Sequence, residues 1–202
     1  LTGNSISFDT DAIKKAEILF SYGGSPIGNS RVKLTNMEDC INNRYIKKGE
    51  NPLHIAAEQL VNDHVNILHT IGGDDTNTSA GDLVEYLKNN GYDLTVVGLP
   101  KTVDNDVFPI QQTLGAWTAA EQGAIFFENI ANENTTSSRQ LIIHEIMGRN
   151  CGWLTAATAM EYRTKLKERK FIPSLLISNE RWDVDAVYIP EMKINLIDET
   201  NR

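Results

Sequence analysis

The sequence is poor in the residues that would suggest a disulfide framework, a metal cluster or a nucleic-acid surface. It has two cysteines, Cys40 and Cys151, and four scattered histidines, and none of them stands in a metal-ligand spacing. The net charge is −8, and no basic run exceeds two residues. We therefore expect no nucleic-acid partner, because an acidic surface repels phosphate backbones.

Long apolar runs are missing as well. No stretch approaches the roughly 18 apolar residues that a membrane span requires, and residues 1–4 do not resemble a secretory leader. The chain also lacks an initiator Met and stops abruptly at Arg202. We expect a cytoplasmic protein that binds no membrane, and an incomplete chain.

What the sequence does contain is an alternation of short β-rich runs and amphipathic stretches. Apolar residues make up 41% of the chain, enough for a folded core. Strands are predicted at residues 66–71, 94–98, 141–143, 174–177 and 187–189. Helices are predicted around 80–87, with Gly91 as the terminator, and at 113–131 and 150–163. This alternation predicts an α/β fold with a mostly parallel sheet covered on both faces by helices. In such sheets ligands bind where the strands end.

The first strand-to-helix junction is the segment Gly72–Thr76. Two glycines allow a tight turn and a close approach to a ligand, and the helix N-terminus that follows favours anions. Asp74 would repel a bare phosphate, but it suits a magnesium–phosphate complex, because Mg²⁺ is typically held by one or two carboxylates plus phosphate oxygens. Alternatively, Asp74 or Asp75 caps the helix that begins near Thr76.

The second junction, Gly98–Asp106, gathers polar groups at a strand end, including Lys101 and Asp104. Phosphoryl transfer needs such a set: a base for the attacking hydroxyl, a metal ligand and cations that offset charge. The alternative is an Asn-Asp turn held by Asx hydrogen bonds. That turn would explain Asn105 and Asp106, but it would leave Lys101 and Asp104 without a purpose.

The third junction, Glu145–Gly152, also lies between a predicted strand and a predicted helix. Arg149 offers a planar fork that suits a phosphate or a transition-state oxygen. A single arginine at a strand end is more often part of a surface ion pair, so this segment alone is weak. The three junctions together favour phosphate chemistry more strongly than any one of them.

Taken in order, these segments resemble the phosphofructokinase family. The matching segments are Gly72–Asp74, Pro100–Asp106, Met147–Arg149, the glycine-rich donor segment Tyr22–Arg31, and Pro190–Glu191. The resemblance spans residues 22 to 191 and implies Rossmann-like lobes with parallel sheets flanked by helices. The Thr-Val-Asp-Asn-Asp run followed by Met-Gly-Arg is highly specific to the family.

The resemblance implies a role for each matching residue. Asp104 would be the base that takes the proton from the 1-hydroxyl of fructose 6-phosphate, and Asp74 would bind Mg²⁺ with help from Asp106. Gly73 and Arg31 would contact the phosphate donor. The residues that would line the sugar phosphate are Thr102, Val103, Asp104, Met147, Gly148, Arg149 and Glu191.

Two positions bear on the donor. ATP-using family members commonly carry glycine at the position of Asp75 and often at that of Lys101, whereas pyrophosphate-using members typically show the Asp/Lys pair. The Asp75 carboxylate would project into the space of an ATP α-phosphate and repel it. Lys101 would steady the compact pyrophosphate, and Arg149 would face the transferring phosphoryl group. With Asp104 as base, these residues form the predicted catalytic set.

The resemblance thus implies a reversible, Mg²⁺-dependent transfer from pyrophosphate to fructose 6-phosphate, giving fructose 1,6-bisphosphate and phosphate in glycolysis or gluconeogenesis. Residues 1–115 would bind the donor and 116–202 the sugar phosphate, in a homo-oligomer of two or four subunits. A family arginine contributed across the subunit interface falls on Gln140, beside Arg139, which leaves the role of Arg139 open. The alternatives are an ATP-dependent enzyme and a catalytically silent regulatory paralogue, the latter disfavoured because the site residues are complete.

Overall fold

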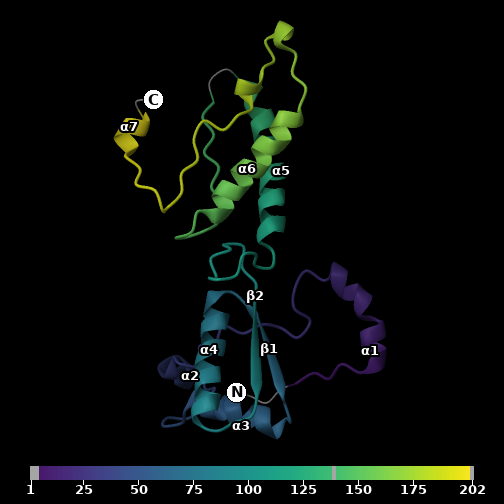
Figure 1. The fold of residues 1–202 in the computed structure, drawn as a ribbon, viewed down its shortest axis with the longest axis vertical. Helices are drawn as coiled ribbons and strands as arrows, with labels where there is room; N and C mark the ends of the chain where they lie inside the picture. Colours follow the sequence, from purple (N-terminus) through teal and green to yellow (C-terminus); the bar gives the residue numbers. More distant parts are fainter. Residues whose placement is uncertain (1–4, 138–139, 201–202) are drawn as a thin grey trace. The chain divides into compact units, whose positions relative to one another are not determined.

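The computed structural model describes residues 5–137 and 140–200, and the chain divides into two units, residues 1–99 and 100–202 (Figure 1). The elements of the first unit are α1 (Thr10–Lys14), the 3₁₀ helix η1 (Ala16–Ser21), α2 (Met37–Asn42), α3 (Pro52–Asn62), β1 (Ile67–Gly72), α4 (Asp74–Asn89) and β2 (Thr95–Pro100), whose last residue begins the second unit. Those of the second unit are α5 (Ala116–Asn134), α6 (Trp153–Glu168), the 3₁₀ helices η2 (Pro173–Leu175) and η3 (Asn179–Arg181), and α7 (Leu196–Thr200). The assignment of donor and sugar binding to separate lobes stays a prediction.

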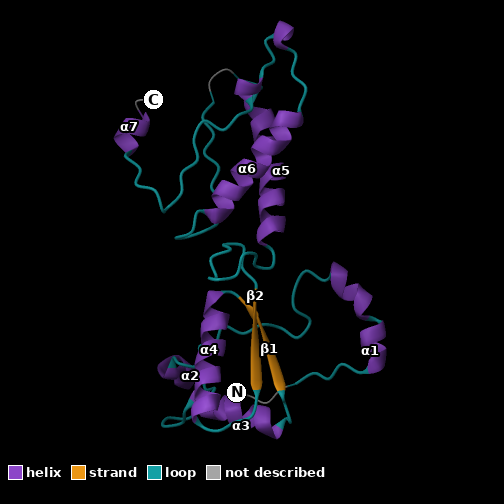
Figure 2. Cartoon of the chain, viewed as in Figure 1, coloured by secondary structure: helices purple, strands orange, loops and turns teal. Residues whose placement is uncertain are grey.

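The sheet of the first unit pairs β1 with β2 (Figure 2). The Thr95 amide donates a hydrogen bond to the Asn66 carbonyl over 3.0 Å. Because these residues stand where the two strands begin, the strands run parallel, as a strand–helix–strand unit requires. The two predicted strands and the helix between them are confirmed.

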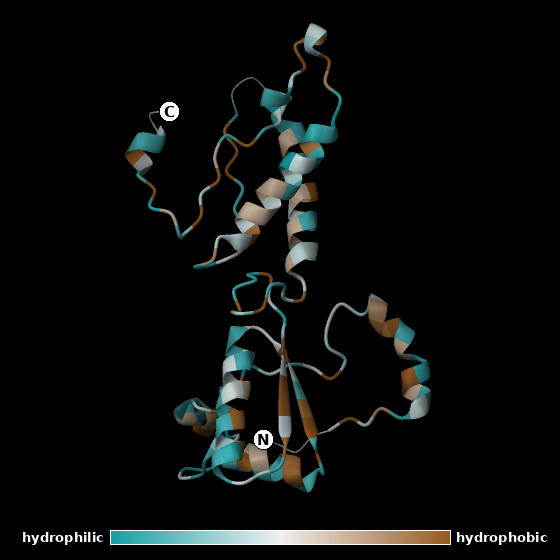
Figure 3. Ribbon diagram, viewed as in Figure 1, coloured by the Kyte–Doolittle hydropathy of each residue, from teal (hydrophilic) through white to brown (hydrophobic). Residues whose placement is uncertain are grey.

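Apolar side chains of α3 and α4 pack on one face of this sheet. The buried members of this core are Ala57, Leu83 and Leu87, and half-buried Leu68 and Val96 come from the two strands. Figure 3 shows both strands as mainly hydrophobic. On the other face Ile67 and Ile71 are 60% and 58% exposed. Among the described residues the packed core lies on one face of the sheet, and the predicted α/β class with a parallel sheet is confirmed.

The ends of α3 and α4 follow from local sequence. The Asn51 side chain accepts a hydrogen bond from the Leu53 amide over 2.9 Å, and Pro52 occupies the first turn of α3, where its missing N–H costs nothing. Gly91 has a φ of +74°, a left-handed conformation that glycine adopts without steric cost. The prediction that Gly91 ends the helix is confirmed.

In the second unit, α5 and α6 lie side by side (Figure 1). Small residues on α5, among them the fully buried Ala124, allow the two helices to approach closely. A Cβ on Gly123 would stand 2.9 Å from the Thr158 hydroxyl of α6, so glycine is needed at this contact. Both helices were predicted, but each begins three residues later than the sequence indicates and extends further.

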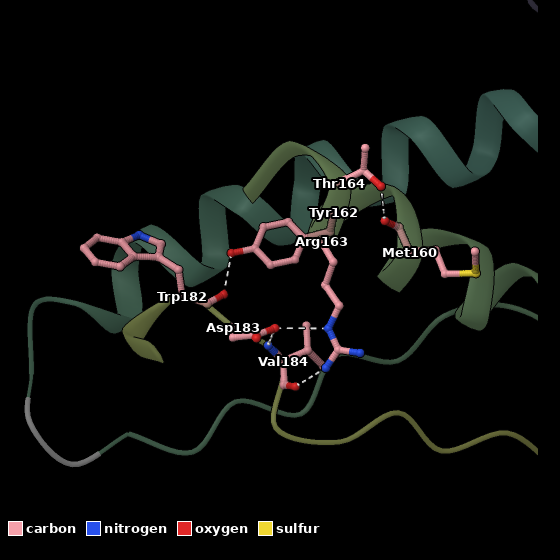
Figure 4. Close-up of polar contacts among 7 residues, drawn as sticks. All are labelled: Met160, Tyr162, Arg163, Thr164, Trp182, Asp183 and Val184. Carbon is pink, nitrogen blue, oxygen red and sulfur yellow. Dashed lines mark hydrogen bonds and ion pairs between the residues drawn. The ribbon is translucent and has the colours of Figure 1, made fainter. Parts of the chain in front are cut away.

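A long excursion, residues 169–186, leaves the end of α6 and returns to it (Figure 4). The Tyr162 hydroxyl donates to the Trp182 carbonyl over 2.6 Å. The Arg163 guanidinium binds the Asp183 carboxylate at 3.0 Å and the Val184 carbonyl at 2.6 Å. Tyr162 is only 2% exposed, and burial raises the pKa of its hydroxyl. This segment is an anchored part of the fold.

The three predicted strands at 141–143, 174–177 and 187–189 are wrong. Residues 141–148 alternate between exposed and half-buried side chains, as a strand would, yet no described segment pairs with them. Residues 174–177 form a tip in which the 3₁₀ helix η2 is closed by a bridge between Ile172 and Ile177. A strand is stabilised by hydrogen bonds to a neighbour, which β-rich composition alone does not supply.

Within residues 5–137 and 140–200, no helix combines the length and the apolar composition that crossing a bilayer demands.

Candidate active site

The predicted site residues divide between the two units. Gly73, Asp74, Asp75 and Arg31 belong to the first unit, and all the remaining ones belong to the second. Each half is described here by itself.

The turn between β1 and α4 is built for close backbone contact. Gly72 is buried, and a Cβ there would stand 2.2 Å from the Thr76 hydroxyl, so a larger residue cannot fit. The side-chain nitrogen of Asn77, Nδ2, donates to the backbone carbonyls of Gly72 and Gly73 over 3.0 and 2.8 Å. These bonds hold the glycine turn in one conformation.

Asp74 and Asp75 are the first two residues of α4, and both are exposed. The helix cap is Gly73, without a side-chain hydrogen bond, so the interpretation of either aspartate as the cap is wrong. Carboxylates in the first turn are stabilised by the positive end of the helix dipole. Two acidic groups are therefore held, at little cost, at the strand end where a ligand would bind.

Lys33 adds a cation that the sequence analysis missed. Its Nζ atom lies 2.8 Å from Oδ1 of Asp75. The hydrogen bond to Asp75 raises the pKa of Lys33 above its ordinary value, and the charges of Asp75 and Asp74 act in the same direction. The only signal in the sequence was the closeness of Lys33 to Arg31 in the predicted donor segment.

The donor segment itself, Tyr22–Arg31, is irregular and exposed throughout. It turns at Gly28, whose φ of +77° suits glycine and whose amide donates to the Ser25 carbonyl over 3.0 Å. The donor role of Arg31 stays a prediction.

In the second unit, the loop after β2 is closed by side chains. The Asn105 carboxamide oxygen accepts from the Thr113 amide over 2.8 Å, and its nitrogen donates to the Gln111 carbonyl over 3.2 Å. The Thr113 hydroxyl, in a side chain only 1% exposed, donates to the Thr102 carbonyl over 2.6 Å. The Asn105 side chain thus bonds to residues six and eight positions further along the chain, so the local Asx hydrogen bonds of the alternative interpretation are not what holds this loop. The closed loop holds Asp104 in place.

Asp104 carries an unusual carboxylate. Its backbone amide donates to the Thr102 hydroxyl over 3.1 Å. Oδ1 of its side chain is shielded from solvent and forms no hydrogen bond within the described part of the chain. Leaving such an oxygen unpaired costs free energy unless a ligand satisfies it. Lys101 and Asp106, on either side of Asp104 in the chain, are exposed, and Val103 is half-buried.

Three separate segments of the second unit are joined around Asp104. The Cys151 thiol donates to the Asp104 carbonyl over 3.3 Å. The Gly152 amide donates to Oε1 of Glu191 over 2.8 Å. Cys151 thus ties the loop that carries Asp104 to the third junction. The structure brings the Asp104 loop, the third junction and Glu191 together.

Within the third junction, Gly148 has a φ of +138°, and a Cβ there would stand 2.3 Å from the Cys151 carbonyl oxygen. The geometry of the turn alone therefore requires glycine at position 148. Met147 and Arg149 on either side of it are exposed, Met147 by 71%. Arg139 lies outside the described residues, and Gln140 is exposed.

Exposed carboxylates of either unit have the chemistry to share a magnesium ion with a phosphate ligand. Among the described residues, no group of three or more His, Cys, Asp or Glu side chains forms a metal cage. Mg²⁺ needs none, because it usually keeps several waters and takes one or two carboxylates plus phosphate oxygens. Asp74 in the first unit and Asp106 in the second are each an exposed carboxylate of this kind, and their assignment to one metal ion stays a prediction.

Comparison with known proteins agrees with these features. The phosphofructokinase family matches residues 4–199. A pyrophosphate–fructose 6-phosphate 1-phosphotransferase from Methylomonas methanica is 58% identical over all 202 residues and 49% of its own length. One from Propionibacterium freudenreichii subsp. shermanii is 52% identical over the same 202 residues and 50% of its length. The chain spans about half the length of the curated relatives it matches.

A solved structure has a similar fold. A crystal structure of a pyrophosphate-dependent phosphofructokinase from Marinobacter aquaeolei has a TM-score of 0.54 and 23% identity, and the match covers 68% of this chain and 32% of that one. At this identity the likeness concerns the fold alone. With the family match over nearly its whole length, the chain belongs to the phosphofructokinase family.

Proposed function

We propose that the protein carrying this chain is a pyrophosphate-dependent 6-phosphofructokinase. It would transfer a phosphoryl group reversibly from pyrophosphate to the 1-hydroxyl of fructose 6-phosphate. The observation that carries the proposal is the shielded, unpaired carboxylate oxygen of Asp104, on a loop tied to the third junction through Cys151. A carboxylate with one unsatisfied oxygen, held in an ordered loop, has the chemistry of a base for the hydroxyl proton of a substrate.

In the forward reaction the 1-hydroxyl oxygen of fructose 6-phosphate attacks a phosphorus atom of pyrophosphate, and Asp104 accepts the hydroxyl proton. The bond from that phosphorus to the bridging oxygen of pyrophosphate breaks, and phosphate leaves. Base catalysis of this kind typically contributes about 10²- to 10⁴-fold. Arg149 and Lys101 offset the negative charge that spreads over the transferring group.

The remaining predicted residues bind the sugar phosphate, the donor and the metal ion. Thr102, Met147, Gly148 and Glu191 line the sugar phosphate in this proposal, and Gly73 and Arg31 contact the donor. Mg²⁺, when bound, would offset charge on the donor phosphates, and Asp74 with Asp106 would hold it.

The choice of donor rests on Asp75 and Lys101. An acidic side chain in the first turn of α4 would occupy the room of a nucleotide α-phosphate and repel it. The names of the two relatives compared across the whole chain, both pyrophosphate-dependent, support this choice. An ATP-dependent enzyme of the same fold is the competing candidate.

Kinetics of Asp104→Asn, in protein expressed from the complete reading frame, test the proposal. We expect kcat to fall by about 10²- to 10⁴-fold, while calorimetry shows fructose 6-phosphate binding within about threefold of wild type. The matched control is Asp93→Asn, an exposed aspartate outside the site, which should leave both unchanged. Near-normal turnover in Asp104→Asn would refute the base assignment, and turnover with ATP but not pyrophosphate would refute the donor.

A further inference from the structure

The ion pair between Lys33 and Asp75 brings together two distant parts of the first unit. Asp75 opens α4, whereas Lys33 lies in the loop before α2, two residues after Arg31. The two side chains are 53% and 74% exposed, yet their charged atoms stand only 2.8 Å apart. Lys33 therefore contacts the same carboxylate that selects the phosphate donor in the proposed function.

The backbone of Lys33 is fixed where the side chain departs. Its carbonyl accepts hydrogen bonds from the Asn36 amide over 3.0 Å and from the Cys40 thiol over 3.6 Å. Cys40 is completely buried, and Asn36 caps α2 by accepting from the Asp39 amide over 3.1 Å. Lys33 thus projects from an ordered turn.

Stability alone does not account for this pair. An exposed ion pair adds little to folding, because water screens it and two long side chains lose freedom. Asp75 is already favoured by the helix dipole in the first turn of α4. A role at the ligand site explains why a lysine from elsewhere in the chain faces this aspartate.

We infer that Lys33 is a positioning residue for donor selection, which holds the Asp75 carboxylate at the start of α4 and offsets its charge. The inference rests on the proposed function. Asp75 excludes a nucleotide by its shape, but its charge also repels pyrophosphate, which is itself strongly anionic. A neighbouring ammonium group weakens that repulsion and leaves the steric exclusion in place.

A double-mutant cycle with Lys33→Met and Asp75→Gly tests this inference in the full-length protein. In the wild-type background, Lys33→Met should raise KM for pyrophosphate by up to about fivefold, the range of exposed ion pairs. The values of kcat and of KM for fructose 6-phosphate should stay close to wild type. Lys33→Arg should restore the lower KM, and the effect should shrink at high ionic strength. In the Asp75→Gly background, Lys33→Met should raise KM for pyrophosphate by a smaller factor, because only the direct attraction between Lys33 and the donor is then lost.

The matched control is Lys15→Met, which removes the exposed Lys15–Asp11 ion pair of α1 and should change no kinetic constant. An unchanged KM in Lys33→Met, or an equal rise with and without Asp75, would overturn the inference. The wild-type assay with pyrophosphate and with ATP decides the proposed function separately. Turnover with ATP but not with pyrophosphate would refute the proposed function and the inference with it, whereas turnover with pyrophosphate and an unchanged KM in Lys33→Met would refute the inference alone.

Discussion

Thr113 supports the proposed base without touching a substrate, and Thr113→Val isolates that support. Valine keeps the shape of the side chain but loses the hydroxyl that donates to the Thr102 carbonyl over 2.6 Å. Thr113 is 1% exposed, so water cannot replace the lost donor. Leaving a buried carbonyl unpaired costs about 1–3 kcal/mol of unfolding free energy.

Thr113→Val should also lower the reaction rate. Thr102 also accepts a hydrogen bond from the Asp104 amide, so a shift of Thr102 moves the base. Misplacement of a reacting group by about 1 Å can cost on the order of a hundredfold in rate. We expect kcat to fall by about tenfold to a hundredfold, with KM for fructose 6-phosphate within about threefold of wild type. Denaturant unfolding and steady-state kinetics at pyrophosphate saturation measure the two effects.

Thr158→Val provides the matched control. Thr158 is also buried, at 4% exposure, but its hydroxyl has no hydrogen-bond partner within the described part of the chain. Replacing an unpaired buried hydroxyl by a methyl group should be neutral or stabilising. If Thr113→Val left kcat at the wild-type value, the loop would not position the base as argued. If both variants lost equal stability, the hydrogen bond would not be the cause.

Two further predictions concern packing and pH. Gly152→Ala should lower the unfolding free energy by about 1–3 kcal/mol and raise KM for fructose 6-phosphate, because the new alanine Cβ would stand 2.3 Å from Cβ of Ile189. The control is Gly81→Ala in α4, where a Cβ would meet nothing within 4 Å. It should raise the unfolding free energy, measured by thermal unfolding, by about 0.5–1 kcal/mol. The hydrogen bond to Glu58 raises the pKa of Tyr92 from 10 to about 12. Wild type should therefore be more stable than Tyr92→Phe below pH 10, and this advantage should be lost as the pH rises through about 12. Denaturant titrations across this range check the sign, and a gain that grew with pH would contradict it.

The sequence predicted best those elements that a local pattern defines. Helix α4 was identified from the spacing of Ala80, Leu83, Val84 and Leu87, which are buried in the structure except for Val84, which is 42% exposed. Its end was identified from Gly91, since a left-handed residue stops a helix. The strand assignments at 141–143 and 187–189 failed, because pairing depends on a partner far away in the chain.

The site divides along the same line. The residue types, their order and their spacing are properties of the sequence, and they were sufficient to identify the family. The roles of the carboxylates, the lysine and the arginine in phosphoryl transfer stay predictions. The tertiary structure decided which of them contact one another. It closed the base loop through Thr113, tied Cys151 to the Asp104 carbonyl and Glu191 to Gly152, and set Lys33 against Asp75. These contacts join positions remote in sequence, so no local periodicity or motif encodes them, and only the folded chain brings their atoms within bonding distance.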